Sequence, residues 1–122
     1  MATREKIEKN LRILYDEVFN NGRSDLLSTV VSESYVQHNP LFPDGPGPLL
    51  AYLKEVGSIP CQVKRMAIDG DLAFVHVRYL NWGGKEQAAV DIFRCDRSGK
   101  FKEHWDVLQP VPEKAANSNT MF

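Results

Sequence analysis

The chain has 122 residues, of which 43% are hydrophobic and 25% charged, a composition expected of one folded domain over residues 1–122. Its formal net charge is -1 at pH 7, which gives no electrostatic basis for binding nucleic acid or an anionic membrane. No segment resembles a membrane-spanning helix or a signal peptide, and we therefore expect a cytoplasmic protein.

Helical periodicity dominates the first part of the chain. Residues 4–20 are predicted to form a helix, because apolar side chains recur there at helical spacing with charged side chains opposite. Thr3 can cap its start, and Asn21–Gly22 suits its end. A second, short helix is predicted over Asp25–Val31, and a third helix from Pro48 to about Val56.

The segment between Tyr35 and Pro48 is predicted to be a loop, since it contains four prolines and two glycines. It also carries His38, Leu41 and Phe42, which are unusual side chains for a solvated loop. Loops of this composition often cover a cavity. We therefore expect this loop to close a pocket.

Periodicity changes from 3.6 to 2 after the third helix, and four strands are predicted. They span Cys61–Ile68, Leu72–Asn81, Glu86–Cys95 and Lys100–Gln109. Short turns join them, which indicates an antiparallel meander and an α+β fold with the helices on one sheet face. Apolar residues occupy both faces of Val90–Cys95, so we expect a second copy of the chain to cover the other face, giving a homodimer through the sheet.

Polar side chains interrupt these apolar strands. His104 and Asp106 share one face of the last strand, whereas strict alternation places Phe101 and Trp105 on the opposite face. Asp91 lies on the adjacent strand and can face the same cavity. The polar residues expected to converge on this pocket are His38, His76, Arg78, Asp91, His104 and Asp106. The alternative is structural: Asp91 pairs with an arginine, and His76 faces solvent.

A carboxylate in an apolar cup has a raised pKa and can remove a proton from carbon beside a carbonyl. We expect Asp106 to be this general base, with His104 and His38 donating hydrogen bonds to the enolate oxygen and Asp91 as a second acid or orienting group. The expected substrate-binding residues are Tyr35, Phe42, His76 and Arg78. The expected ligand is a small carbonyl compound.

This chemistry requires no metal and no cofactor, and neither is predicted. Histidines with carboxylates can bind metals, but the chain has no HxH or HExxH spacing. Two other uses of the fold stay open: a small-molecule binding module without chemistry, and an interaction scaffold whose sheet serves only to dimerise.

The two cysteines, Cys61 and Cys95, lie in predicted strands and do not form a CxxC pair. No other thiol is present to complete a zinc site. We expect both to be small buried hydrophobic side chains.

Three stretches of the chain resemble the SnoaL-like polyketide cyclase family of the nuclear transport factor 2-like superfamily. They are Tyr35-Val-Gln-His-Asn-Pro40, Val90-Asp-Ile-Phe-Arg94 and Gly99-Lys-Phe-Lys-Glu-His-Trp-Asp-Val-Leu-Gln-Pro110. The resemblance implies a cone-shaped α+β barrel, a pocket at its open end and dimers through the sheet. It also implies cofactor-independent aldol closure of a polyketide-like substrate.

By this resemblance, the acid/base aspartate of the cyclases falls on Asp106, and the loop histidine falls on His38. The pocket histidine that the cyclases carry on the preceding strand falls on Asp91, where this chain departs from the pattern. Two neighbouring acids bind a different number of protons at a given pH from an acid beside a histidine.

Overall fold

The computed structural model describes residues 1–122. Thr3 caps the N-terminal helix, since its hydroxyl accepts a hydrogen bond from the Lys6 backbone N–H at 3.1 Å. Helix α1 (Arg4–Arg12) runs directly into a π-helical segment, η1 (Ile13–Asn20), so the helix predicted over 4–20 is present in full. The side chains of its apolar stripe that are at most 1% exposed are Ile7, Leu11, Leu14, Tyr15 and Val18.

Two short helical turns and a strand follow. The turns η2 (Ser24–Leu26) and α2 (Leu27–Val30) occupy the predicted second helix, and the chain then enters β1 (Val31–Gln37). The expectation of loop from Tyr35 onward is therefore wrong for Tyr35–Gln37. The reason is a distant partner, because β1 pairs in parallel with the last strand of the sheet.

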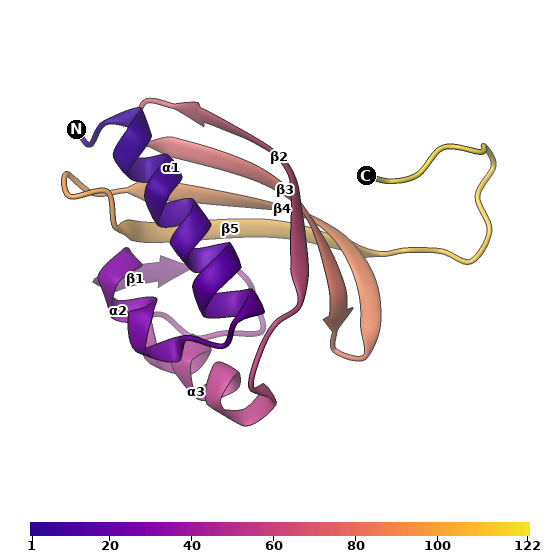
Figure 1. The fold of residues 1–122 in the computed structure, drawn as a ribbon, viewed down its shortest axis with the longest axis horizontal. Helices are drawn as coiled ribbons and strands as arrows, with labels where there is room; N and C mark the ends of the chain where they lie inside the picture. Colours follow the sequence, from indigo (N-terminus) through magenta and orange to yellow (C-terminus); the bar gives the residue numbers. More distant parts are fainter.

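The rest of the fold follows the predicted order. Helix α3 (Gly47–Val56) carries a proline in its first turn. The meander strands are β2 (Cys61–Asp69), β3 (Leu72–Trp82), β4 (Lys85–Cys95) and β5 (Phe101–Pro110). The sheet order is β1-β5-β4-β3-β2, antiparallel except between β1 and β5. Figure 1 shows this sheet curving around α1, so the predicted α+β fold is confirmed.

Alternation along β3 and β4 separates two faces of the sheet. Val75, Val77 and Phe93 point toward the helices and are at most 3% exposed. Phe74 and Val90 point the other way and are 37% and 39% exposed. The helices thus cover only the concave face, and apolar side chains of the outer face remain partly exposed.

A bulge near the start of β5 changes which of its side chains share a face. The pairing of β4 with β5 shifts register between Arg94 and Cys95, and Cys95 then lies opposite Phe101. Phe101 consequently points into the core with 0% exposure, on the same side as His104. The alternation that groups Phe101 with Trp105 is wrong at this position.

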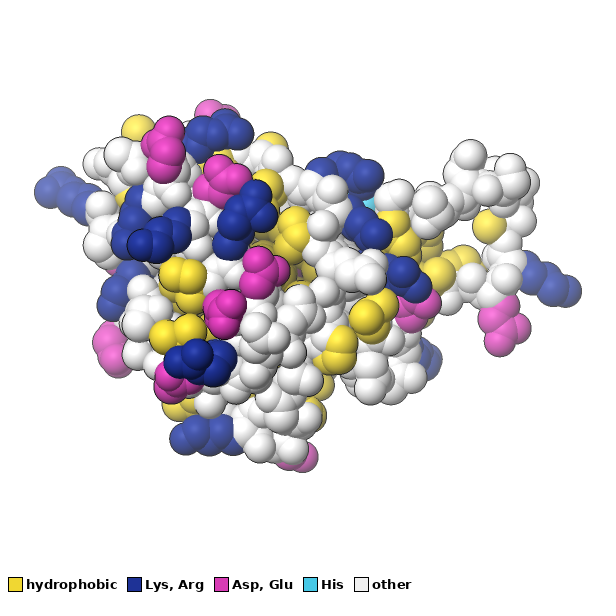
Figure 2. Space-filling model, viewed as in Figure 1, with side chains coloured by type: hydrophobic (Ala, Val, Ile, Leu, Met, Phe, Trp, Pro, Cys, Tyr) yellow, Lys and Arg dark blue, Asp and Glu magenta, His cyan; other side chains and the backbone are white.

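Residues 111–122 leave the end of β5 as a polar tail that turns back toward the sheet (Figure 1). The ring of Phe122 stacks over His76 on the outer face, with 6.0 Å between ring centroids. Figure 2 shows basic and acidic side chains intermixed over the surface of α1, without a patch of one sign. No helix in the protein has the length and apolar character needed to cross a membrane.

Candidate active site

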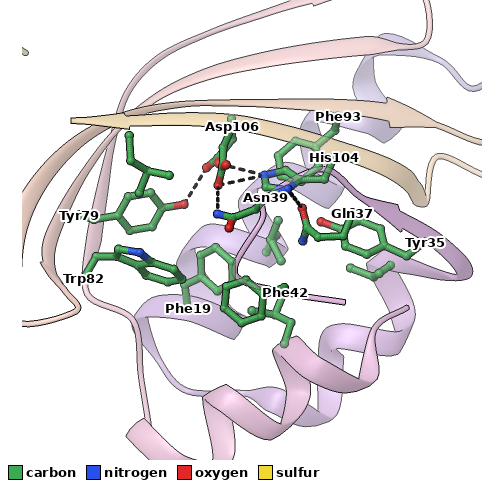
Figure 3. A pocket seen from close by; sticks show the side chains of 15 residues that line it. Phe19, Tyr35, Gln37, Asn39, Phe42, Tyr79, Trp82, Phe93, His104 and Asp106 are labelled. Carbon is green, nitrogen blue, oxygen red and sulfur yellow. Dashed lines mark hydrogen bonds and ion pairs between the residues drawn. The ribbon is translucent and has the colours of Figure 1, made fainter. Parts of the chain in front are cut away.

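A cavity lies between the concave face of the sheet and the helical layer, with a volume of about 40 Å³. Figure 3 shows Phe19, Phe42 and Trp82 on one side of it and Gln37, Asn39, His104 and Asp106 on the other. The apolar lining residues include Leu14, Phe19, Phe42, Leu49, Trp82 and Leu108. The polar lining residues are Tyr35, Gln37, Asn39, Tyr79, Asp91, His104 and Asp106.

Asp91 is the centre of the polar side and is 3% exposed. Its Oδ2 accepts hydrogen bonds from the hydroxyls of Tyr15 and Tyr79, each at 2.6 Å. Its Oδ1 lies 3.0 Å from Nε2 of His104. Burial, followed by the charge of Asp91, raises the pKa of both tyrosines well above the usual value, so both remain proton donors. Asp91 therefore has no free oxygen to offer a ligand.

His104 bridges the two acids of the cavity. Its Nδ1 lies 2.6 Å from Oε1 of Gln37, and the Asn39 backbone N–H donates to the same oxygen at 3.0 Å. Because an N–H can only donate, this contact fixes the amide orientation, and His104 Nδ1 must carry a proton. Nε2 faces Asp91 and lies 3.9 Å from Oδ2 of Asp106. Both ring nitrogens are thus occupied.

Asp106 is the acid with a free oxygen. The Asn39 side-chain amide donates to its Oδ2 at 2.9 Å, whereas its Oδ1 makes no hydrogen bond with the chain. Burial raises the pKa of Asp106, the contacts with Asn39 and His104 oppose that rise, and the charge of Asp91 adds to it. A half-desolvated carboxylate of this kind is a stronger base than a solvated one.

Tyr35 and Phe42, both expected to contact the ligand, line the cavity. The ring of Tyr35 stacks over His104 with 6.2 Å between centroids, and burial raises the pKa of its phenol, which therefore stays protonated. Phe42 packs against Tyr52 and Trp82 at centroid distances of 5.8 and 6.0 Å. Phe42 and Trp82 line the apolar side of the cavity, and Tyr52 packs against both rings.

The structure places His38 outside the cavity. Its Nε2 pairs with Oε2 of Glu103 at 2.8 Å, and its ring stacks on Trp105 at 4.8 Å on the outer face. Successive side chains of an extended segment alternate sides, so His38 points outward while Gln37 and Asn39 point inward. The expectation that His38 reaches the pocket is wrong for this reason.

His76 and Arg78 also lie outside the cavity, on the outer face of β3. The register sets Val75 opposite Asp91, so the neighbouring positions point away from the helices. Arg78 pairs with Glu86 at 2.7 Å, and His76 contacts Arg65. The expectation that His76 and Arg78 face the same pocket as Asp91 is wrong, because strand alternation puts them on the opposite side.

Four residues of the polar network did not emerge from the sequence: Tyr15, Gln37, Asn39 and Tyr79. Tyr79 continues the buried alternation of Val75 and Val77, and this phase is a signal that could have found it. The inward positions of Gln37 and Asn39 depend on β1, which the local pattern does not predict.

Asp91, His104 and Asp106 each place one potential metal-ligating atom within 4.8 Å of the others. An imidazole with two carboxylates can bind a divalent metal. Here Asp91 and His104 are hydrogen-bonded to each other, and two phenol hydroxyls donate hydrogen bonds to the second oxygen of Asp91. A cation would have to displace these contacts, so the donor set fits an ion-pair network better than a metal centre.

A curved sheet wrapped around N-terminal helices, with a polar-sided cavity between them, defines a protein of the nuclear transport factor 2-like fold. Within that fold, residues 11–104 match the family described as SnoaL-like domain, and the chain belongs to this family. The resemblance found in the sequence is thereby confirmed. No curated protein sequence matches the chain.

Solved structures agree with this assignment at the level of the fold. TsrD from Streptomyces laurentii has a TM-score of 0.74 and 18% identity, with 88% of this chain and 91% of that chain covered. An NTF-2 like protein of unknown function from Burkholderia xenovorans has a TM-score of 0.73 and 18% identity, covering 92% and 89%. IdmH from Streptomyces antibioticus, a candidate polyketide cyclase, has a TM-score of 0.65 and 19% identity, covering 84% and 91%.

Proposed function

We propose that the protein is a cofactor-independent lyase or isomerase that acts on a small carbonyl or polyketide-like substrate. The observation that carries this proposal is Asp106. It has a raised pKa in an apolar cavity and an oxygen, Oδ1, that no protein group occupies. The likeness to a candidate polyketide cyclase supports the same class of chemistry.

In the proposed reaction, Asp106 removes a proton from carbon beside the carbonyl group. The C–H electron pair forms the C=C bond of an enolate, and the carbonyl π pair moves to oxygen. The enolate carbon then attacks a second carbonyl carbon of the same molecule, whose π pair moves to its oxygen. Alternatively, where a C=C bond is conjugated with the enolate, the resulting dienolate is protonated at its far carbon. The first outcome is an aldol closure and the second an isomerisation; Asp106 returns the proton in both.

Tyr35 is the proposed hydrogen-bond donor to the enolate oxygen, because its phenol lines the cavity and burial keeps it protonated. The sequence predicts His104 and His38 for this role, but neither has a free donor in the cavity. His104 has both ring nitrogens engaged, and His38 lies on the outer face. The hydrogen-bonded His104–Asp91 pair instead provides fixed charges and dipoles beside Asp106.

The proposal is tested by incubating the protein in D₂O with a panel of ketones and β-dicarbonyl compounds. Deuterium incorporation beside the carbonyl is followed by mass spectrometry, which detects proton removal even when no later step occurs. We expect Asp106→Asn to abolish incorporation and Asp71→Asn, at an exposed ion pair, to retain it. Undiminished incorporation in Asp106→Asn would overturn the assignment of the base.

A non-catalytic binding module is the second candidate function, and the complete hydrogen bonding of Asp91 and His104 favours it. A fully satisfied network suits ligand binding without proton transfer. Saturable binding of panel compounds by calorimetry, with no deuterium incorporation for any of them, supports this candidate over the first.

We also propose that a second copy of the chain covers the outer face of the sheet. Exposed apolar side chains support this, among them Val107 at 71% exposure and Val90 at 39%. Light scattering coupled to size exclusion tests it. We expect Val107→Glu to lower the molar mass from dimer to monomer, whereas Leu41→Glu, on the loop, leaves it unchanged; a monomeric wild type contradicts the proposal.

A further inference from the structure

The loop between β1 and α3 arches over the cavity and is pinned at both ends. At its start, the His38 N–H donates to the His104 carbonyl at 2.9 Å. At its end, the Gly45 N–H donates to the Tyr35 carbonyl at 2.7 Å. Residues 39–44 form the arch between these pins, and two of its side chains enter the cavity.

Asn39 is the first of these side chains and is 5% exposed. Its Oδ1 accepts a hydrogen bond from the Leu41 N–H at 2.9 Å, which fixes the orientation of the amide. The amide nitrogen is thereby directed at Asp106 and donates to Oδ2 at 2.9 Å. Figure 3 shows Asn39 directly beneath Asp106. The loop thus supplies the hydrogen bond that holds this carboxylate.

Phe42 is the second, and it lies in the aromatic cluster with Tyr52 and Trp82. Its backbone N–H donates to the carbonyl of Asn39 at 3.2 Å, so the two residues belong to one turn. The cavity volume of about 40 Å³ is far below the roughly 300–1,000 Å³ of ordinary ligand pockets. An organic substrate can enter only if part of the lining moves.

We propose that Asn39 is a positioning residue that couples opening of this loop to Asp106: a ligand that displaces Phe42 draws Asn39 away from Oδ2. The inference rests on the proposed role of Asp106 as base and adds a control over that role. With the loop closed, Asp106 is a hydrogen-bonded carboxylate. With the loop open, it loses its donor and becomes a stronger base beside the bound substrate.

The ionisable groups around Asp106 do not provide this control, because they lie on strands of the sheet and do not move with the loop. His104 on β5 favours the charged carboxylate, and Asp91 on β4 opposes it. Tyr35 on β1 and Tyr79 on β3 are buried phenols that stay neutral. Asn39 is the one polar neighbour carried by a loop.

The test is a carbon-detected NMR titration of the Asp106 carboxyl group, assigned by its absence in Asp106→Asn. We expect Asn39→Ala to move the titration upward by roughly one pH unit, as loss of a hydrogen bond to a charged group requires. Leu41→Ala is the matched control, since Leu41 lies on the same loop and its side chain is 74% exposed. It should leave the midpoint unchanged.

Phe42→Ala tests the coupling itself, because it loosens the arch and keeps the Asn39 amide. It also admits water, which lowers the Asp106 pKa, so its effect on the midpoint is compared in wild type and in Asn39→Ala; we expect a more upward shift in wild type, where the Asn39 hydrogen bond can be lost. A wild-type midpoint in Asn39→Ala overturns the positioning role, and equal effects of Phe42→Ala in the two backgrounds overturn the coupling. Neither result bears on the deuterium-exchange test, so failure of this inference and failure of the proposed function are distinguishable.

Discussion

The hydroxyl of Tyr15 lies 2.6 Å from Oδ2 of Asp91 and joins the N-terminal helical layer to the middle of β4. Tyr79 donates to the same oxygen from β3, and His104 contacts the other oxygen from β5. Segments distant in the sequence thus meet at one buried carboxylate. Such a network fixes the side chains around it, and losing its centre is costly.

Asp91→Asn should destabilise the protein by about 3–5 kcal/mol, because the amide removes the partner of His104 and presents an N–H₂ group to a phenol or to the imidazole. Urea unfolding followed by circular dichroism measures this loss. Asp71→Asn is the control, since its ion pair with Arg94 is exposed and should contribute less than about 1 kcal/mol. Equal losses in the two variants would contradict the central role of Asp91.

Tyr15→Phe and Tyr79→Phe should each cost about 1.5–3 kcal/mol, the usual contribution of a hydrogen bond to a charged group. Because both phenols donate to one oxygen, we expect the double variant to depart from additivity by at least about 0.5 kcal/mol. A double-mutant cycle in urea measures this coupling. The Tyr52 hydroxyl makes no hydrogen bond with the chain, so Tyr52→Phe should leave the free energy of unfolding nearly unchanged.

Asp106→Asn should make stability less dependent on pH. The pKa of Asp106 is raised in the folded protein, so between the unfolded value of about 3.9 and the folded value the native state binds more protons. Its contribution to stability is therefore full at low pH and is lost as pH rises through the folded pKa. We expect Asp106→Asn to melt no lower than wild type at pH 7, with its relative advantage shrinking toward pH 4. An advantage that instead grows on acidification contradicts the raised pKa.

Cys61 and Cys95 should not react with thiol reagents while the protein is folded. Both are buried, and burial raises the pKa of each thiol to about 12. Ellman's reagent should therefore detect less than about one thiol per chain at pH 8, and both after unfolding in urea. Ser98→Cys, at an exposed turn, is a positive control that should react at once.

Local periodicity was sufficient to predict the helix over 4–20 and the four antiparallel strands, because each depends on neighbours a few residues away. The same alternation put His104 and Asp106 on one strand face with Asp91 on the next strand. Those three side chains lie together in the structure.

The wrong expectations share one cause, which is dependence on pairing between distant segments. β1 exists because β5 offers it a partner, and only that pairing turns His38 outward and sends Gln37 and Asn39 into the cavity. The register of β3 against β4 likewise decides that His76 and Arg78 face away from Asp91.

The last strand, β5, shows which properties of Asp106 a local sequence pattern can predict and which it cannot. Its alternating pattern identifies Asp106 as a carboxylate facing an apolar layer, since side-chain direction along a strand is a local property. Only the tertiary structure decides that Asp106 has a free oxygen, a hydrogen bond from Asn39 and a raised pKa. The physical reason is that burial and hydrogen bonding depend on which distant groups surround a side chain.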